Sequence, residues 1–230
     1  MNLFYSKNIS NQLSKSESKH CLFSLRMNIN DDIYITDGIG NIYKAKIQQI
    51  KNQIVMYGDL ELISINKKKI RIHIAIAPTK NKTRFEWFLE KVTEIGIDSI
   101  FPIICQNSER KKLNQIRCEN ILISAIKQSK NSVLPIIYTP IKFEDFINSH
   151  KKNSYIAHCH KTDKKSFNHL LKENNHTEDI TLFIGPEGDF SEKEVNFAYK
   201  KGIIPVELGK TRLRTETAGV VGCTIMNLSR

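Results

Sequence analysis

Three short motifs toward the C-terminal end hold the residues whose types and spacing could do chemistry. They are Gly185-Pro186-Glu187-Gly188, Leu208-Gly209 and Leu213-Arg214-Thr215-Glu216-Thr217-Ala218. Two of them follow predicted strands and the third opens a predicted helix, so each begins in a tight turn. Glycine lets a ligand approach the backbone closely, and proline presets φ at the second turn position. Three such turns close in sequence could build one concave site that grips a nucleotide-like cofactor mainly through main-chain groups.

The first motif is ambiguous when it is taken alone. It lacks the Gly-Lys-Ser/Thr ending of a phosphate-binding P-loop and the Gly-x-Gly-x-x-Gly spacing of a dinucleotide fingerprint. A plain strand-to-helix turn therefore explains Gly185–Gly188 better than a binding loop does. Its functional meaning depends on the other two motifs.

Arg214 and Glu216 flank Thr215 at the predicted start of the last helix. A capping threonine and a first-turn acid that complements the helix dipole would account for this pattern. The functional interpretation adds an arginine beside the site, able to grip a phosphate or polarise a base carbonyl. The sequence leaves both interpretations open.

The other clusters of reactive side chains have plainer explanations. His158-Cys159-His160 could ligate a metal, but neighbouring residues alternate across a strand and no partner cluster exists, so a strand end explains them better. Arg84, Lys91 and Glu94 lie on or near one predicted helix, where a solvated ion-pair face accounts for them. No Ser/His/Asp or Cys/His set stands out. We expect no metal.

Length, charge and cysteine content narrow the class of protein. The 230 residues suit one large domain plus a small one. A formal net charge of +11 favours a polyanionic partner, most simply nucleic acid, although a lysine-rich surface that serves only solubility explains it equally well. The five cysteines are scattered without a Cys-x-x-Cys pair, which argues for a reducing compartment. The sequence shows no apolar leader and no membrane-spanning stretch, so we expect a cytosolic protein.

The N-terminal part of the chain reads as β structure. Alternating runs at 32–36 and 41–47 flank Asp37-Gly38-Ile39-Gly40, and Asp-Gly between such runs is a strong hairpin signal. Another β-prone run follows at 53–57. Several short strands in so short a span suggest a small barrel, and Asn66–Lys69 reads as a linker.

From Ile70 onward, predicted strands alternate with predicted helices, which implies a mostly parallel sheet covered on both faces. Helices are expected from about 83 to 95, ended by Gly96, and from 113 to 129. The second of these should bury Ile116, Ile123 and Ile126 as one stripe. The strands are expected at 70–77, 100–104, 154–157, 181–184 and 203–208.

The last two helices are the best specified. Ser191-Glu192-Lys193-Glu194 is a capping box, in which the serine oxygen accepts from an early backbone N–H and the glutamate reaches back. This helix should continue to Lys201 and stop at Gly202. The final helix should start near Thr215 and carry Val221, Ile225 and Leu228 into the core.

The three motifs, in this order and spacing, resemble the RsmE-type family, the uracil-N3 methyltransferases of small-subunit (16S) ribosomal RNA in the SPOUT superfamily. The likeness extends over nearly the whole chain. Lys91–Gly96 is similar to the family's Lys-x-x-Glu-Leu-Gly helix, and Gln128-Ser129 with Pro135 is similar to its glutamine-rich helix end. His20–Arg26 and Asp37-Gly38 are similar to its N-terminal domain.

The resemblance implies an α/β protein with a PUA-like RNA-binding β-barrel over 1–68 and a SPOUT methyltransferase domain over 69–230. A deep trefoil knot is implied at about 180–230, although knots are otherwise almost absent from proteins. It also implies a homodimer and S-adenosyl-L-methionine as cofactor, with S-adenosyl-L-homocysteine as product and no metal. The cofactor residues it implies are Leu182, Ile184, Gly185, Glu187, Gly188, Leu208, Gly209, Leu213, Thr215, Thr217 and Ala218.

The implied reaction moves a methyl group from a sulfonium to N3 of one uridine, in ribosomal RNA within the 30S subunit. Our hypothesis is that Arg214 stabilises negative charge on the uracil and that Glu216 orients Arg214 or relays the proton. N3 lies on the Watson–Crick edge, so the target base must be unpaired or rotated out of its stack. The implied RNA-binding residues are Lys7, Lys19, Arg26, Arg84, Lys91, Gln128 and Lys130.

Two departures from the family's pattern accompany the likeness. Asp189 stands where members commonly have a second glycine, and Lys130-Asn131 replaces a frequent Gly-Arg pair. Two other functions stay open: a knotted methyltransferase that acts on another RNA atom or on transfer RNA, and a non-catalytic RNA-binding assembly factor. The second predicts no cofactor binding, whereas all three cofactor motifs are present.

Overall fold

The computed structural model describes residues 1–66, 70–149, 153–173 and 178–229. The chain divides into two compact units. The first contains residues 1–66 together with Ile123–Leu134, and the second contains the remaining described residues. Most of the expected linker, Asn66–Lys69, lies outside the described residues.

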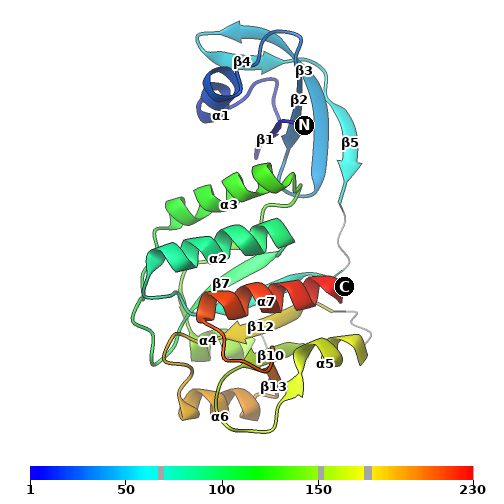
Figure 1. The fold of residues 1–230 in the computed structure, drawn as a ribbon. Helices are drawn as coiled ribbons and strands as arrows, with labels where there is room; N and C mark the ends of the chain where they lie inside the picture. The colour runs from blue at the N-terminus through cyan, green and yellow to red at the C-terminus, as the bar shows by residue number, and fades with distance from the viewer. Residues whose placement is uncertain (67–69, 150–152, 174–177, 230) are drawn as a thin grey trace. The chain divides into compact units, whose positions relative to one another are not determined.

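The first unit is a curled five-stranded sheet with a short helix (Figure 1). The strand order is β1-β2-β3-β4, with β5 paired to β3, and only β1 and β2 run parallel. The expected hairpin joins β2 to β3, where Asp37 Oδ1 accepts from the N–H groups of Ile39 and Asn41. The strands are β1 (Leu3–Tyr5), β2 (Asp32–Thr36), β3 (Asn41–Lys51), β4 (Ile54–Tyr57) and β5 (Glu61–Ile65).

One helix, α1 (Lys15–Lys19), continues directly into a π-helical segment, His20–Ser24. The core of this unit is built from Phe4, Leu13 and Cys21 together with apolar residues of β2, β3 and β4. The expectation of a small β domain at the N-terminal end is confirmed as this curled sheet.

The second unit is the mostly parallel α/β sheet that the alternation of strands and helices predicts. Its order is β11-β13-β10-β12-β6-β7-β8, with β9 also paired to β7, and all of these pairs are parallel. The strands are β6 (Ile72–Ile76), β7 (Ser99–Ile104), β8 (Ile136–Ile137), β9 (Ile141–Lys142), β10 (Ser154–Ala157), β11 (Lys165–Ser166), β12 (Ile180–Ile184) and β13 (Ile204–Glu207).

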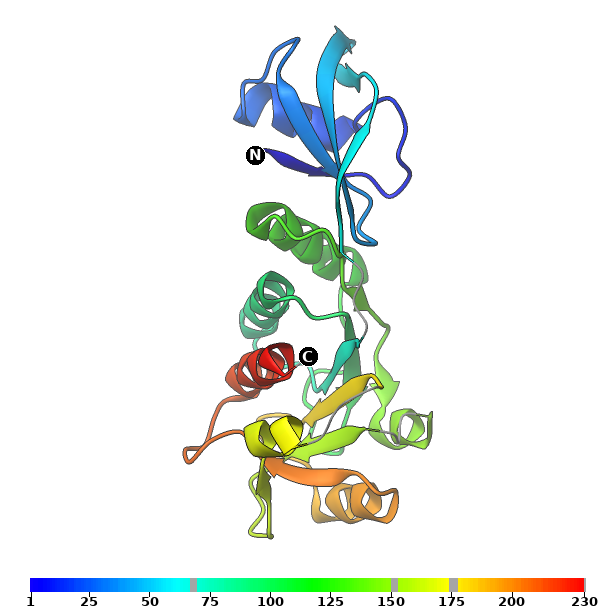
Figure 2. The same ribbon diagram turned by 90° about the vertical axis from the view of Figure 1, so that its right-hand side faces the viewer.

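Helices cover both faces of this sheet (Figure 2). On one face, α4 and α6 bury phenylalanines such as Phe143, Phe183 and Phe190 against the strands. On the other face, α2 and α7 pack side by side, and Phe88 of α2 lies against Gly219 of α7. The helices of this unit are α2 (Lys82–Ile95), α4 (Phe143–Ser149), α5 (Phe167–Glu173), α6 (Glu192–Lys200) and α7 (Thr215–Leu228). One further helix, α3 (Gln115–Ser129), begins in the second unit and ends in the first.

The local end signals of these helices are confirmed. Gly96 ends α2 with φ at 108°, a left-handed conformation that glycine adopts without steric cost. Ser191 and Glu194 form the complete capping box at the start of α6. These signals act over a few residues, so they can be read without knowing the tertiary fold.

Two expected buried stripes are wrong. In α7, Leu228 is 83% exposed and Val221 and Ile225 are only partly buried, whereas Gly219, Gly222, Cys223 and Met226 face the core. In α3, Ile116 is 73% exposed and the buried positions are Cys118, Leu122, Ala125 and Ile126. The buried face of α7 contains two glycines because a side chain at Gly219 would collide with Phe88, and one at Gly222 would collide with Leu182.

Candidate functional site

The three motifs come together at one edge of the parallel sheet. β10 lies between β12 and β13, and all three strands point the same way, so their carboxyl ends meet at this edge. Gly185–Gly188 follows β12, and Leu208-Gly209 follows β13. Ligands of open α/β sheets bind in the crevice outside the carboxyl ends of the strands.

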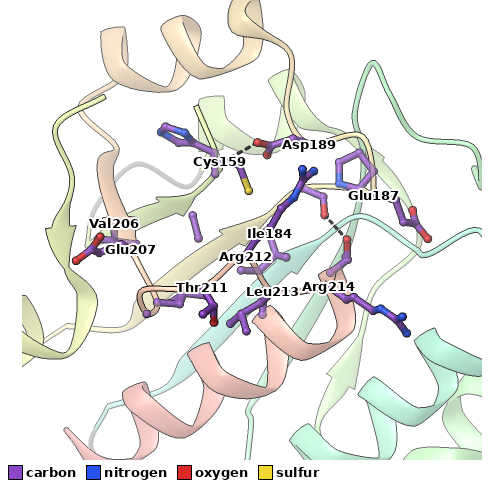
Figure 3. Close-up of a pocket in the computed structure, with 18 of the residues that line it drawn as sticks. Cys159, Ile184, Glu187, Asp189, Val206, Glu207, Thr211, Arg212, Leu213 and Arg214 are labelled. Atoms are coloured by element: carbon purple, nitrogen blue, oxygen red, sulfur yellow. Dashed lines mark hydrogen bonds between the residues drawn. The ribbon is translucent and has the colours of Figure 1, made fainter. Parts of the chain in front are cut away.

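A cavity of about 680 Å³ opens at this edge, within the size range of small-molecule and cofactor sites (Figure 3). In Figure 3, Glu187 and Asp189 come from the loop after β12, and Val206 and Glu207 from the end of β13. The loop before α7 supplies the residues from Thr211 to Arg214. The complete lining consists of Arg84, Ala157–Cys159, Lys164, Ile184–Glu187, Asp189, Val206–Thr215 and Ala218.

Glu187 lines the cavity but is also anchored to the neighbouring loop after β6. Its Oε1 accepts from the N–H of Lys80 at 2.9 Å. On the other side, Asn107 Nδ2 donates to the carbonyl oxygens of Gly188 and Asp189, each at 3.1 Å. The loop after β12 is therefore held from two neighbouring loops, which fixes the backbone groups that face the cavity.

Asp189 adopts a backbone conformation that favours glycine. Its φ is +62°, in the left-handed region where glycine is favoured and aspartate is among the better tolerated alternatives. Its carboxylate accepts from Cys159 N–H at 2.7 Å and from Phe190 N–H at 2.8 Å, and Figure 3 shows the bond to Cys159. Asp189 thus ties the loop after β10 to the loop after β12.

Thr215 is not the capping residue of α7. The N-cap is Arg214, whose side chain makes no capping hydrogen bond. Thr215 instead donates its hydroxyl to the carbonyl oxygen of Gly185 at 3.1 Å and so joins the first motif to the third. Helix capping therefore does not explain why an arginine and a threonine stand here.

Glu216 is buried and faces Arg84 of α2, not Arg214. Its Oε1 lies 3.7 Å from Arg84 Nε, and its side chain is 8% exposed. Its Oε2 is buried without a hydrogen-bond partner. Arg214, in contrast, is exposed and forms no ion pair within the part of the chain that the structure describes. The structure therefore shows a contact between Glu216 and Arg84, and the orientation of Arg214 by Glu216 stays a prediction.

The end of β10 forms a wall of the cavity that sequence reasoning missed. His158 Nε2 shares a 2.7 Å hydrogen bond with Tyr199 of α6, and Lys164 Nζ donates to the backbone oxygens of His158 and His160. Burial, reinforced by the nearby Lys164 charge, lowers the pKa of His158 to about 4. Cys159 is the exposed cysteine of the five, and it lies in the cavity wall. The Lys164 and Asp189 contacts hold this strand end beside the first motif.

The remaining expected residues lie outside the cavity lining. Leu182 is buried in β12 against α7, Gly188 contacts Asn107, and Thr217 is partly buried in α7. Of the expected RNA-binding residues, only Arg84 lines the cavity. Lys91 pairs with Glu90 and Glu94, as an ion-pair face on α2 would require. Lys7, Lys19, Arg26, Gln128 and Lys130 are exposed in the first unit.

Lys130 also takes a conformation typical of glycine. It follows the last residue of α3 with φ at +57°, the left-handed position at which helices commonly end. It therefore occupies a backbone position at which glycine is favoured.

Neither a metal centre nor a membrane-spanning helix is found in the described part of the chain. Its histidine, cysteine and acidic side chains nowhere gather in threes with the geometry to hold a metal ion. None of its helices combines the length and apolar character that crossing a bilayer requires.

Comparison with known proteins identifies the family. A family model described as the RNA methyltransferase domain matches residues 66–227. The chain belongs to this family. A second model, described as the RNA methyltransferase PUA domain, matches residues 13–55 of this RNA methyltransferase family member.

Individual relatives extend over nearly the full length of the chain. Ribosomal RNA small subunit methyltransferase E of Buchnera aphidicola is 29% identical over 218 residues, which cover 91% of this chain and 85% of that protein. A structure from Porphyromonas gingivalis, described as a "probable rRNA-methyltransferase", is 37% identical with a TM-score of 0.90, covering 99% of this chain and 98% of that one. A ribosomal RNA small subunit methyltransferase E from Neisseria gonorrhoeae, bound to S-adenosyl methionine, is 25% identical with a TM-score of 0.84, covering 99% and 97%.

Proposed function

We propose that this protein transfers a methyl group from S-adenosyl-L-methionine to N3 of a uridine in small-subunit ribosomal RNA. The observation that carries the proposal is the cavity of about 680 Å³ in which all three motif segments meet at the carboxyl edge of the sheet. The named function of the Buchnera and Neisseria relatives supports the reaction and its substrate. The bound ligand of the Neisseria structure supports the cofactor.

The residues of the cavity fit this cofactor in size and in charge. A side chain on Gly209 would meet no atom within 4 Å, so the backbone at this point borders open space that a ligand could fill. The cavity lining carries charges of both signs. Three carboxylates, those of Glu187, Asp189 and Glu207, suit the sulfonium and ammonium groups of the cofactor. The cations that suit its carboxylate are Arg84, Lys164, Lys210, Arg212 and Arg214. Leu208, Gly209, Leu213 and Ala218 supply the apolar and backbone surface that a purine ring requires.

The cofactor, when bound, supplies an electrophilic methyl group, and the protein must position the base and favour its deprotonated form. Well-oriented reactants lower a barrier by roughly 7–11 kcal/mol through positioning alone. We assign Arg214 to the uracil, where its guanidinium stabilises the negative charge left when N3 loses its proton. Its exposed position in the cavity lining, without a competing acid, leaves its donors available.

We assign Glu216 to Arg84 as a positioning residue. The buried carboxylate attracts the guanidinium across 3.7 Å, so Arg84 is held in the cavity wall beside α7. Three arginines then line the cavity: Arg84 of α2, which is paired with Glu216, and Arg212 and Arg214 of the loop before α7. This arrangement would present positive charge to the substrate phosphates and to the developing uracil anion.

We propose that the RNA contacts both a PUA-like domain over 1–68 and a methyltransferase domain over 69–230. Lys7, Lys19 and Arg26 would hold phosphates through the curled sheet, and Gln128 and Lys130 would do so from the end of α3. Lys91 is a weaker candidate because its amino group already pairs with two carboxylates. We propose an assembled 30S subunit as the substrate and the cytoplasm, where ribosomal subunits are found, as the location.

We also propose the trefoil knot over about 180–230 and the homodimer that the family resemblance implies. The exposed apolar side chain of Leu228 and the partly buried Val221 and Ile225 support a dimer, since they leave apolar surface along α7 for a second copy. The proposed dimer is tested by light scattering of the wild type and of Leu228→Lys. We expect the wild type to be a dimer and Leu228→Lys to dimerise more weakly, and a monomeric wild type would refute the proposal.

The proposed reaction is tested by transfer of labelled methyl from S-adenosyl-L-methionine to small ribosomal subunits that lack the modification, with naked ribosomal RNA in parallel. We expect transfer to subunits by the wild type and a loss of about 100-fold or more in rate for Arg214→Ala at saturating substrates. A folded protein that binds the cofactor and transfers methyl to neither RNA would refute the proposal. Binding of RNA without binding of cofactor would indicate a non-catalytic RNA-binding factor instead.

A further inference from the structure

A short surface segment of the first unit, Phe23–Ile29, combines features that the core of the domain does not require. Phe23 is 59% exposed, and Leu25 and Ile29 are exposed beside it. The segment begins within the π-helical turn and passes through Arg26, whose φ is +54°. Exposed apolar side chains and a left-handed backbone conformation outside glycine each carry a cost in free energy. Their occurrence within one short segment therefore calls for a common explanation.

The π-helical turn separates a buried side chain from an exposed one. Leu25 N–H donates to the carbonyl oxygen of His20 at 3.1 Å, five residues earlier, which is the π pattern. Cys21 is fully buried in the core while Phe23, two residues later, projects from the surface. Single π turns of this kind occur frequently at functional sites.

Arg26 is held in the left-handed conformation by its neighbours. Met27 is buried in the core of the unit, and Asn28 Nδ2 donates to the carbonyl oxygen of Arg26 at 3.3 Å. Asn28 N–H in turn donates to Asp31 Oδ2 at 2.7 Å. The backbone is therefore anchored on the C-terminal side of Arg26, whose side chain is exposed three residues after Phe23 in the sequence.

The charges around this segment favour an anionic partner. Lys15, Lys19 and Arg26 are exposed, and Lys19 lies four residues before Phe23 on the same helical run. The nearby acid Glu17 is buried and paired with Lys127 at 2.8 Å, and Asp31 is engaged by Asn28. A second copy of the same surface, placed by a two-fold axis, would bring like charges face to face. An RNA strand suits both features of the segment. Its anionic phosphates can pair with the cations, and the apolar face of an unpaired base can stack on the exposed ring.

We propose that Phe23 is a stacking platform for an unpaired base of the RNA substrate, with Lys19 and Arg26 holding the adjacent phosphates. This inference rests on the proposed function in one respect only, that the substrate is RNA. It assigns to the first unit the recognition of a single-stranded segment, whereas phosphate contact alone would serve a duplex equally well.

The test measures the affinity of the full-length protein for a single-stranded uridine-rich oligonucleotide and for a hairpin of matched length, by fluorescence anisotropy. Stacking on an aromatic side chain contributes enough that alanine substitution weakens single-strand binding by about 5- to 150-fold. We expect that loss for Phe23→Ala and for Phe23→Leu, near wild-type affinity for Phe23→Trp, and little change for any variant with the hairpin. Ile39→Ala is the matched control, because Ile39 is an apolar side chain of the same unit that is 80% exposed.

A second readout reports stacking directly. The chain has one tryptophan, Trp87, so Phe23→Trp in a Trp87→Phe background places the only indole at the proposed platform. Quenching of its fluorescence on addition of the single strand is expected, and unchanged fluorescence with bound RNA would overturn the proposal. Full affinity in Phe23→Leu would also overturn it, because a general apolar contact would then suffice.

Failure of this inference is distinguishable from failure of the proposed function. A wild type that methylates ribosomal RNA while Phe23→Ala binds the single strand normally refutes the platform and leaves the reaction standing. A wild type that binds the single strand through Phe23 but transfers no methyl refutes the reaction and leaves the platform standing. Loss of self-association in Phe23→Ala, with RNA binding unchanged, would reassign the surface to a protein contact.

Discussion

The contact between Glu216 and Arg84 predicts that the two residues act as one unit in catalysis. The perturbations are Glu216→Gln, Arg84→Ala and the double variant. The carboxylate of Glu216 is almost fully buried and its second oxygen has no hydrogen-bond partner, so the charge of Arg84 is its main compensation. Removal of either charge should release Arg84 from the cavity wall or remove it altogether.

The size of the effect follows from the distance and the exposure of the pair. At 3.7 Å and an effective dielectric constant of about 20, the Coulomb attraction is about 4 kcal/mol. Arg84 is 41% exposed, and burial of Glu216 carries a desolvation cost, so we discount the net coupling to about 1–2 kcal/mol. Each single variant should then lower the rate at saturating substrates by about 5- to 30-fold.

The assay is the rate of methyl transfer to small ribosomal subunits at saturating cofactor and RNA, with folding checked by thermal unfolding. If Glu216 acts through Arg84, the double variant is no slower than the slower single variant. Glu90→Gln is the matched control, because Glu90 also pairs with a cation of α2 but is exposed and outside the cavity. Multiplicative losses in the double variant would refute the reasoning, as would loss of an ionisation from the pH–rate profile of Glu216→Gln, which would indicate a proton relay.

Three further predictions follow, two for residues of the cavity wall and one for the residue that ends α3. The folded state holds the pKa of His158 at about 4, whereas the unfolded chain takes up this proton near pH 6.5, so the free energy of unfolding should fall as the pH decreases between these values. In urea unfolding, the wild type should lose about 2 kcal/mol more of this free energy than His158→Gln between pH 7.5 and 5. Equal losses in the two proteins would contradict this prediction. Cys159 should be alkylated before the four buried cysteines, which peptide mass mapping would show. Because Cys159 lies in the cavity wall, bound S-adenosyl-L-homocysteine should slow its alkylation. An unchanged rate of alkylation with the ligand bound would place the ligand elsewhere. Lys130→Gly should raise the free energy of unfolding by about 1 kcal/mol, because glycine adopts the left-handed conformation without steric cost, and a destabilised variant would refute that account.

Features that depend on a few neighbouring residues were predictable from the sequence. The Asp37–Gly40 hairpin, the glycine that ends α2 and the capping box of α6 all follow from local hydrogen bonding and backbone preference. The alternation of strands and helices likewise predicted the mostly parallel sheet. Each of these signals is contained in one short stretch of the chain.

The buried face of α7 was not predictable from large apolar residues. The helix packs closely on α2 and β12, so its inner face consists of small residues such as Gly219 and Gly222, and the larger Leu228 faces outward. A search for apolar periodicity weights large side chains, and it therefore selected the wrong face. Only the partner surface, Phe88 and Leu182, reveals why glycine is required.

The three motifs of the candidate site could be found in the sequence, but the part of the cavity wall formed by the end of β10 could not. Those motifs drew attention through their turns, whereas His158 and Cys159 read as an ordinary strand end. Their role depends on the position of β10 between β12 and β13, a non-local feature of sheet order. The pairing of Glu216 with Arg84 depends in the same way on the packing of α7 against α2.

The central claim is tested most directly by the identity of the nucleoside that the protein methylates. Small ribosomal subunits lacking the modification would be treated with the protein and S-adenosyl-L-methionine, and the digested RNA would be resolved by liquid chromatography and mass spectrometry against methyluridine standards. The account predicts N3-methyluridine as the product, formed by the wild type and lost in Arg214→Ala. A methyl group on another atom, on another base or on transfer RNA would contradict it, even if the protein proved to be an active methyltransferase.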